Sequence, residues 1–239
     1  MKKSRVYDAI GVAGEVLITV GVLALLFLAW QLWINNAFVA RDQQKLVAEQ
    51  SQQWNTVSPT PSEGAKETWP APAVEKVDAG KVIGNLYIPR LGESNTRAIG
   101  ESVTPELTLN RGYFGHYSDT QMPGENGNFA LAVHRSGWGT GFKDAQLLQT
   151  GDRIYIETES GFYGYTVRNI EYVLPTSLDV LAPAPGSEIN DANQSIMTIT
   201  TCSPQDGNVE RLVVYAVLDS YRDRVSGPFP DLAPMMKQA

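Results

Sequence analysis

Apolar residues are concentrated near the start of the chain, in a long run without a charged side chain. Residues 16–30 read VLITVGVLALLFLAW, and the apolar character extends back to Ile10 and forward to Ile34, with Glu15 as the one ionisable interruption. A helix of this length and composition spans the hydrocarbon core of a bilayer. The pattern therefore predicts a transmembrane anchor over residues 10–34.

Charges on the two sides of this run predict its orientation. Lys2, Lys3 and Arg5 precede it, whereas no Lys or Arg lies between the run and Ala40. Basic residues favour the cytoplasmic side, so we expect residues 1–9 in the cytoplasm and everything beyond the anchor outside. A cleaved signal peptide and a buried core helix are the alternatives. The first is disfavoured because no A-x-A cleavage site follows the run.

A polar stretch rich in Gln and Pro, residues 35–80, follows the anchor. Its first half has modest helical character, and its second half contains SPTPSEGAKETWPAPAVEK. This composition predicts an extracytoplasmic linker, because some 40 residues of flexible chain have a root-mean-square span of about 35 Å and no core of their own. Trp69, beside Pro70, is a candidate strap that would dock onto the folded domain.

From about residue 81 the pattern changes to short runs of β-branched and aromatic residues separated by Gly, Pro, Asn and Asp. Strands at this spacing predict an all-β domain over residues 81–224, either a small barrel or a sandwich. The predicted strands are Ile83–Ile88, Asn128–His134, Arg153–Thr158, Phe162–Leu174, Ser195–Cys202 and Arg211–Leu218. Short helices are expected near residues 104–109 and 143–148, and residues 225–239 are expected to form a loose C-terminal tail.

Composition and charge exclude several classes of function. The chain has 239 residues, of which 43% are hydrophobic and 19% charged, so it is not wholly disordered. Its formal charge of −7 gives no electrostatic footprint for nucleic acid, which we exclude as a partner. One cysteine, Cys202, cannot form an internal disulfide, and two histidines are too few for a His-rich metal site. We therefore expect no metal and no cofactor.

The lone cysteine lies at the end of a predicted strand. In SIMTITTC, residues 195–202, strand alternation places Thr198, Thr200 and Cys202 on one face, and Ser203 with the following proline ends the strand. An unpaired thiol outside the membrane meets an oxidising environment. Such a thiol is either a buried small hydrophobe or a reactive group, and its neighbours decide between these alternatives.

A histidine and an arginine are expected beside this thiol. The segment NFALAVH is a predicted strand that ends at His134. If it is a parallel neighbour of the cysteine strand, the two ends meet at one sheet edge, and a return strand starting at Arg211 reaches the same edge. The three groups would supply a nucleophile, a proton donor or acceptor, and a cation for an oxyanion. We expect Arg135 to face the other side as a surface residue, and His116 to have a structural role in a turn.

The sequence around these residues matches a known signature. Residues 198–202, TITTC, match the T-L-x-T-C signature of the sortases, with Ile in place of Leu, and Arg211 follows the cysteine by nine positions. The chain thus resembles the sortases, the membrane-anchored cysteine transpeptidases of Gram-positive cell surfaces. Residues 86–92 and 115–135 look most like the class E housekeeping sortases of actinobacteria, and the resemblance runs from about Val82 to Tyr221.

The resemblance implies a mainly antiparallel, eight-stranded sortase-like β-barrel and a two-step acyl transfer. Cys202 would attack the Thr–Gly carbonyl of an LAxTG-like or LPxTG-like signal near the C-terminus of a secreted protein, while His134 protonates the leaving amine. Arg211 and the backbone N–H near Thr201 would stabilise the oxyanion. An amine of a lipid-linked peptidoglycan precursor would then take the acyl group. Tyr117 is carried over as a residue that influences the choice of signal.

The sequence departs from the class E pattern at two positions. Val133 stands where glycine is usual, and Ser203 stands where histidine is common; both positions line the site rather than react.

Two alternative functions are left open. Within enzymes, the alternative is a pilin-polymerising or hydrolytic sortase-like thiol enzyme that uses the same three residues. From another class, the alternative is a non-catalytic, membrane-tethered binding domain in which Cys202 only packs.

Overall fold

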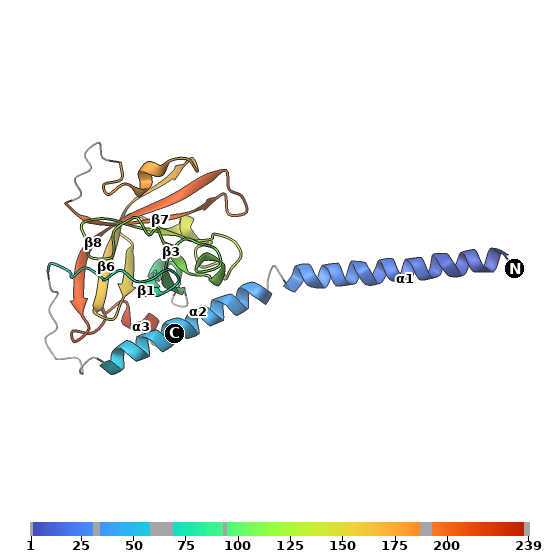
Figure 1. Ribbon diagram of the computed structural model, residues 1–239, viewed down its shortest axis with the longest axis horizontal. Coiled ribbons are helices and arrows are strands. Elements are labelled where there is room, and N and C mark those ends of the chain that lie inside the picture. The colour runs from blue at the N-terminus through green and yellow to red at the C-terminus, as the bar shows by residue number, and fades with distance from the viewer. Residues whose placement is uncertain (1, 31–33, 58–68, 93–94, 187–192, 237–239) are drawn as a thin grey trace.

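The structure has a β-barrel, a helix that lies along the barrel and a long helix that projects away from it (Figure 1). The computed structural model describes residues 2–30, 34–57, 69–92, 95–186 and 193–236. In these ranges the helices are α1 (Lys2–Ala29), α2 (Asn35–Val57) and α3 (Ala233–Met236), with short 3₁₀ helices η2 (Pro89–Leu91), η3 (Leu109–Arg111), η4 (Ala145–Leu147) and η5 (Leu178–Leu181). The strands are β1 (Val82–Tyr87), β2 (Thr96–Glu101), β3 (Phe114–His116), β4 (Gly127–Ala132), β5 (Arg153–Glu157), β6 (Gly161–Val173), β7 (Ser195–Ser203) and β8 (Glu210–Asp223).

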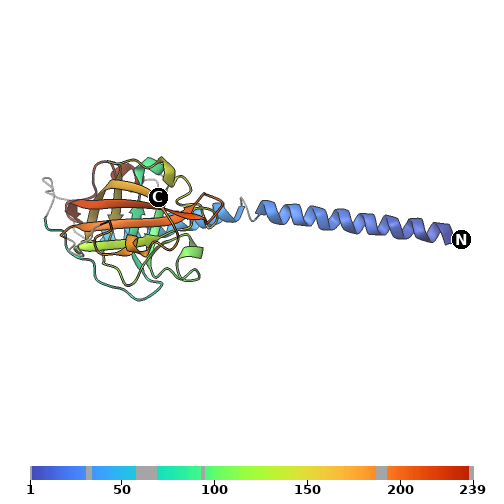
Figure 2. The ribbon, with the colours of Figure 1, turned by 90° about the horizontal axis from the view of Figure 1, so that it is seen from above.

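The apolar run forms most of α1. Within this helix, the segment Ile10–Ala29 is long and apolar enough to cross a membrane, and none of it is buried against the rest of the described structure. Figure 2 shows α1 leading away from one side of the barrel. A helix that exposes an apolar surface on all sides is compatible with a membrane anchor.

The strands close into a barrel in the order β1-β2-β3-β4-β7-β8-β6-β5. Within the described residues, the pairs β2/β3 and β4/β7 are parallel and the others are antiparallel. The prediction of a mainly antiparallel eight-stranded barrel is confirmed. Among the eight strands of the described ranges, closure leaves no open sheet edge to expose to other chains.

The β4/β7 pair shows the alternation of faces that the sequence predicts for the strand of the cysteine. Met197 and Ile199 lie in the barrel core together with Phe129 and Leu131 of β4. The intervening threonines of β7 face the other side, as period-2 alternation requires. The parallel register pairs Leu131 with Ile199, so the carboxyl ends of β4 and β7 lie at the same end of the barrel.

Two strands, β2 and β3, were missed by the sequence analysis. β2 reads TRAIGE, and all six of its residues are buried, including Arg97 and Glu101. β3 has three residues. Buried charged residues and a very short strand give little hydrophobic signal, which explains the omission. The helices expected near residues 104–109 and 143–148 are reduced to turns and the 3₁₀ helices η3 and η4.

The expectation of a flexible linker is wrong for residues 35–57, which form α2 and pack against the barrel. The packed stripe consists of Gln43, Val47 and Ser51, spaced four residues apart along one helix face, and the exposed Asn55 continues it with a hydrogen bond from Arg224. Val47 and Gln43 are buried, and Ser51 donates a 2.8 Å hydrogen bond to Glu157. Because polar side chains make most of these contacts, hydrophobicity alone did not reveal the docked face.

The expectation of a loose C-terminal tail is also wrong as far as residue 236. Phe229, Leu232 and Met235 are buried in a second apolar cluster, which contains Val47 of α2 and three aromatic side chains of the barrel. Tyr155 of that cluster also donates a hydrogen bond to the carboxylate of the tail residue Asp231. The tail therefore fills the space between the barrel and α2. Residues 237–239 lie outside the described ranges.

The chain docks onto the barrel two residues later than expected, at Ala71 instead of Trp69. Trp69 is 65% exposed, so it does not dock, whereas Ala71 is buried in the barrel core cluster. The hydroxyl of Tyr163 donates a 2.9 Å hydrogen bond to the carbonyl of Pro72, and the N–H of Val74 bonds to Pro123. Backbone contacts, which side-chain size does not predict, fix this segment to the barrel.

Candidate active site

Cys202 and Arg211 face each other across the last rungs of the β7/β8 hairpin. They are directly paired in the antiparallel register, and both side chains are partly exposed. Arg211 Nη1 donates to the carbonyls of Asn208 at 3.1 Å and Glu210 at 3.0 Å, so the guanidinium lies against the turn of the hairpin. Paired residues on one face of a hairpin have neighbouring side chains, as expected from the sequence.

His134 reaches the same edge from the neighbouring strand. β4 ends at Ala132, two residues earlier than predicted, and the N–H of Val133 still bonds to the Thr200 carbonyl at 3.1 Å. The ring Nε2 lies 3.1 Å from Asn110 Oδ1, and the Trp138 ring stacks on the imidazole with centroids 6.3 Å apart. Because an amide oxygen only accepts, this contact favours the tautomer with the proton on Nε2. Burial lowers the pKa of His134 below its usual value.

One open cavity of about 380 Å³ contains both the thiol and the imidazole. Its lining consists of His134, Arg135, Ser136, Cys202, Asp206, Gly207 and Asn208. The loop after β4 forms one wall and the β7/β8 turn forms the other. The cavity is large enough for several atoms of a peptide, and it gives solvent and substrate access to the sulfur.

A second, smaller cleft of about 60 Å³ adjoins this edge on the outer face of β7. Tyr117, Thr200 and Arg211 line it, together with the segment around η5 that covers it. The Tyr117 hydroxyl lies 3.1 Å from Thr200 Oγ1. Asn128 Nδ2 donates to the carbonyls of Val180, within η5, and Ala182, directly after it, at 3.0 Å each, and so fixes this cover. Tyr117 and Arg211 therefore lie in one groove, next to the cavity of the thiol.

The expectation that Arg135 is a surface residue is wrong. Its side chain is 6% exposed, and Nη1 donates to the carbonyl of Cys202 at 3.2 Å. Nη2 bonds to Gln146 Oε1 at 2.8 Å. Strand alternation does not apply at this position, because β4 has already ended and the chain has turned. Arg135 joins the loop after β4 to the backbone that bears the thiol.

Comparison with known proteins identifies this arrangement. Residues 86–219 match the protein-family model described as the sortase domain. The chain belongs to the sortase family.

Individual sortases extend the comparison. Sortase SrtE1 of Streptomyces coelicolor is 30% identical over 220 residues, which cover 90% of this chain and 58% of that relative, so the chain spans less than two thirds of its length. The SrtA sortase from Actinomyces oris is 34% identical, with a TM-score of 0.66 over 70% of this chain and 96% of that one. The crystal structure of sortase E1 from Streptomyces coelicolor, which has a tripeptide in the active site, is 29% identical, with a TM-score of 0.58 over 64% and 97%. The expected likeness to class E sortases is confirmed.

Two residues around the reactive groups of this sortase had no clear signal in the sequence: Asn110 bonds to the imidazole, and Trp138 stacks on it. Thr201, which the sequence analysis did single out, is buried, and its Oγ1 donates to the Val133 carbonyl at 2.8 Å. The side chain of Thr201 thus ties β7 to the peptide next to the histidine. The oxyanion role expected for the backbone near Thr201 stays a prediction.

The other histidine of the sortase has a structural environment. His116 is fully buried in β3, with Nδ1 2.7 Å from Glu101 Oε2 and Nε2 3.0 Å from the Gln121 carbonyl. Both ring nitrogens therefore have partners inside the barrel wall, in a strand rather than in the turn expected from the sequence. Across the described ranges, no three His, Cys, Asp or Glu side chains are grouped as metal ligands.

Proposed function

We propose that this sortase is a membrane-anchored cysteine transpeptidase that joins secreted proteins to an amine of a lipid-linked peptidoglycan precursor. The substrate is a C-terminal sorting signal, LAxTG-like or LPxTG-like, cleaved between Thr and Gly. The observation that carries the proposal is the register pairing of Cys202 with Arg211 beside a cavity that Cys202 shares with His134. Membership of the sortase family and the tripeptide in the active site of the Streptomyces coelicolor enzyme support a peptide substrate.

The chemistry follows from three groups. The Cys202 sulfur attacks the threonine carbonyl carbon, the C–N bond to glycine breaks, and His134 gives its proton to the departing amine. The acceptor amine then attacks the thioester, the C–S bond breaks, and the imidazole takes the proton that the amine loses. Arg211 has N–H groups beyond the Nη1 contacts to its own turn, and these stabilise the oxyanion in both steps.

The burial of His134 affects the rate. Its pKa lies below the usual value, so the imidazolium needed to protonate the leaving amine is a minority form at neutral pH. The bond from Nε2 to Asn110 directs the other ring nitrogen, Nδ1, to the exchange of protons during the reaction. A slow turnover is compatible with an enzyme that modifies each cargo protein once.

The same proposal assigns the parts of the chain to compartments. Residues 1–9 lie in the cytoplasm, residues 10–34 cross the membrane once, and the catalytic domain over residues 81–224 lies outside. The length and composition of α1 and the basic residues that precede its apolar run support this orientation.

The test uses the full chain in detergent micelles or nanodiscs, with labelled LAxTG and LPxTG peptides offered with and without an amine. The Cys202→Ala variant is the control. Peptide joined to the amine by the wild type but not by the variant supports transpeptidation. Free acid alone, even with the amine present, indicates the hydrolytic alternative. Peptide that binds but is never cleaved indicates the binding domain, and joining by the variant overturns the mechanism.

A further inference from the structure

The N-terminal half of α2 contacts the loop that holds the imidazole through Asn110. Gln43 is 2% exposed, and its Nε2 donates to the carbonyl of Arg111 at 2.9 Å. Its Oε1 accepts from the N–H of Ala98 in β2 at 3.0 Å. One side chain of α2 therefore bridges the barrel wall to the residue next to Asn110, whose Oδ1 accepts from His134.

The same half of α2 contacts the loop that carries Trp138. The N–H of Gly139 donates to Asn36 Oδ1 at 3.3 Å. The packing is tight: a Cβ placed on Gly112 would lie 2.8 Å from both Val39 Cγ1 and the Trp138 carbonyl oxygen. Gly112 therefore has no room for a side chain, and α2, the end of η3 and the Trp138 loop meet at this point.

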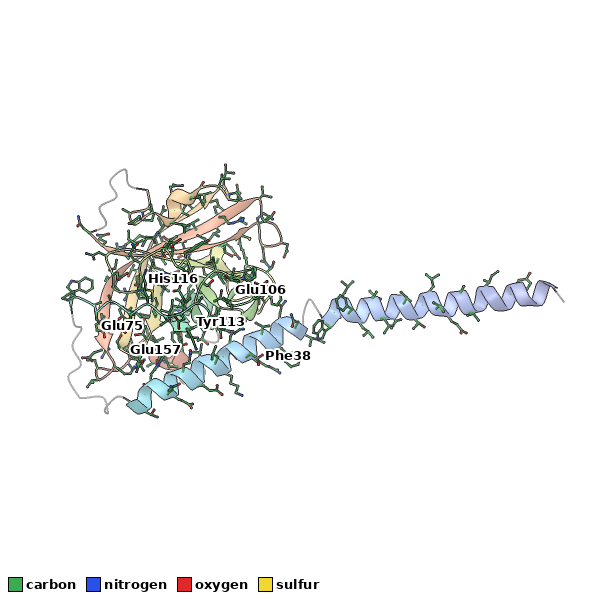
Figure 3. All side chains as sticks on the ribbon, in the orientation of Figure 1. Phe38, Glu75, Glu106, Tyr113, His116 and Glu157 are labelled. Carbon is green, nitrogen blue, oxygen red and sulfur yellow. The ribbon has the colours of Figure 1, made fainter. Side chains whose placement is uncertain are left out.

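The C-terminal half of α2 contacts a different part of the barrel. Ser51 donates to Glu157, and Asn55 accepts from Arg224 at 2.8 Å, both away from the loops around the imidazole. Figure 3 shows α2 along the barrel, with Phe38 on the N-terminal half and Glu157 on the barrel side facing the helix. The two halves can therefore be tested against each other.

We propose that the N-terminal half of α2, residues 35–43, is a positioning element for His134. The imidazole follows the end of β4, so its orientation depends on Asn110 and Trp138, and α2 holds the loops of both. This inference rests on the proposed function, in which His134 moves protons. The segment that joins the membrane anchor to the barrel is thereby part of the support of the active site.

The experiment compares Gln43→Ala with Ser51→Ala in the full chain labelled with ¹⁵N-histidine. Ring ¹⁵N shifts report which nitrogen carries the proton, and His116 provides an internal reference. In Gln43→Ala we expect a smaller Nε2–H population at His134 and a kcat for peptide cleavage about tenfold lower with KM nearly unchanged, since small displacements of a reacting group are costly. In Ser51→Ala we expect a lower melting temperature and neither of the other effects.

A second pair of variants keeps the test decisive if Gln43→Ala does not fold. Asn36→Ala removes an acceptor at the partly exposed start of α2, and Asn36→Asp restores it. We expect the first to shift the His134 ring signals in the same direction as Gln43→Ala and the second to return them. Identical His134 signals in all α2 variants overturn the inference. If the wild type joins no peptide to an amine, the proposed function fails, while the ring signals still decide whether α2 positions the imidazole.

Discussion

Two polar clusters of this sortase differ in how completely their groups are paired. Glu157 is fully buried, and its two oxygens accept hydrogen bonds from four side chains, those of Ser51, Asn85, Tyr87 and Arg224. At the sheet edge that we propose to be catalytic, hereafter the catalytic edge, His134 and Arg211 bond to neighbouring loops, and the thiol opens into a cavity. The first cluster fixes α2 and the chain after β8 to the barrel. The second leaves its reactive groups available to a substrate.

The difference in pairing suggests that the Glu157 cluster contributes mainly to stability and the catalytic edge mainly to reactivity. A buried carboxylate is tolerated because its charge is balanced by Arg224, 3.1 Å away, and because its lone pairs are satisfied. Burial, followed by the charge of Glu157, also raises the pKa of Tyr87 well above its usual value, so the tyrosine remains a donor. Changes at Glu157 should therefore affect folding, whereas changes at the catalytic edge should affect turnover.

The largest expected effect is on stability. Glu157→Gln leaves the buried Arg224 without its counter-charge and should lower the free energy of unfolding by about 3–5 kcal/mol. Glu159→Gln, on an exposed neighbour, is the matched control. Urea unfolding of both variants provides the measurement. A loss below about 1 kcal/mol would show that the cluster is not the anchor of α2.

At the catalytic edge, Arg211→Ala should lower kcat by about 10²–10³-fold, because it removes a donor to the oxyanion. Arg211→Lys keeps the charge but not the planar set of donors and should recover only part of the loss. The free energy of unfolding should change by less than about 0.5 kcal/mol, as at other partly exposed positions. Full activity in the alanine variant would contradict the role assigned to the arginine.

A smaller effect is expected in the groove beside the edge. Tyr117→Phe removes the hydroxyl that lies 3.1 Å from Thr200 and should change the ratio of kcat/KM for LAxTG and LPxTG peptides by about fivefold, which corresponds to roughly 1 kcal/mol for one hydrogen bond. Competition between the two labelled peptides measures this ratio. An unchanged ratio with intact turnover would remove Tyr117 from the choice of signal.

The smallest effect is expected at the more exposed ion pair between Arg153 and Asp219, for comparison with the buried pair of Arg224 and Glu157. Burial works to raise the pKa of Asp219, but hydrogen bonds from Thr166 and Arg153 outweigh it and lower that pKa. Its contribution is therefore present above the unfolded pKa, near 3.9, and is lost as the pH falls through the lower folded value. Asp219→Asn should cost about 0.5–1 kcal/mol at pH 7, after allowance for solvent screening, and progressively less below pH 4. Urea unfolding at pH 7 and pH 3 measures the difference, which should not grow with acid.

The parts of the fold with regular alternation were predictable from the sequence. The strand containing Cys202, the return strand at Arg211 and the strand predicted to end at His134 follow from apolar alternation and turn residues, whereas their pairing entered only as a condition that the register meets. The docking of α2 was not predictable, because its contact face is largely polar. Arg135 was misplaced because the alternation was extended beyond the end of β4.

The shortness of the connection between α1 and α2 sets how the enzyme meets its substrates. α1 ends at Ala29 and α2 begins at Asn35, and chain of this length reaches at most about 20 Å. In the membrane orientation that we propose, this short connection keeps the rim around Gly139, which bonds to Asn36, close to the lipid headgroups. Encounters then become two-dimensional, so the rate of joining should follow the number of substrate molecules per unit area of the leaflet rather than their bulk concentration.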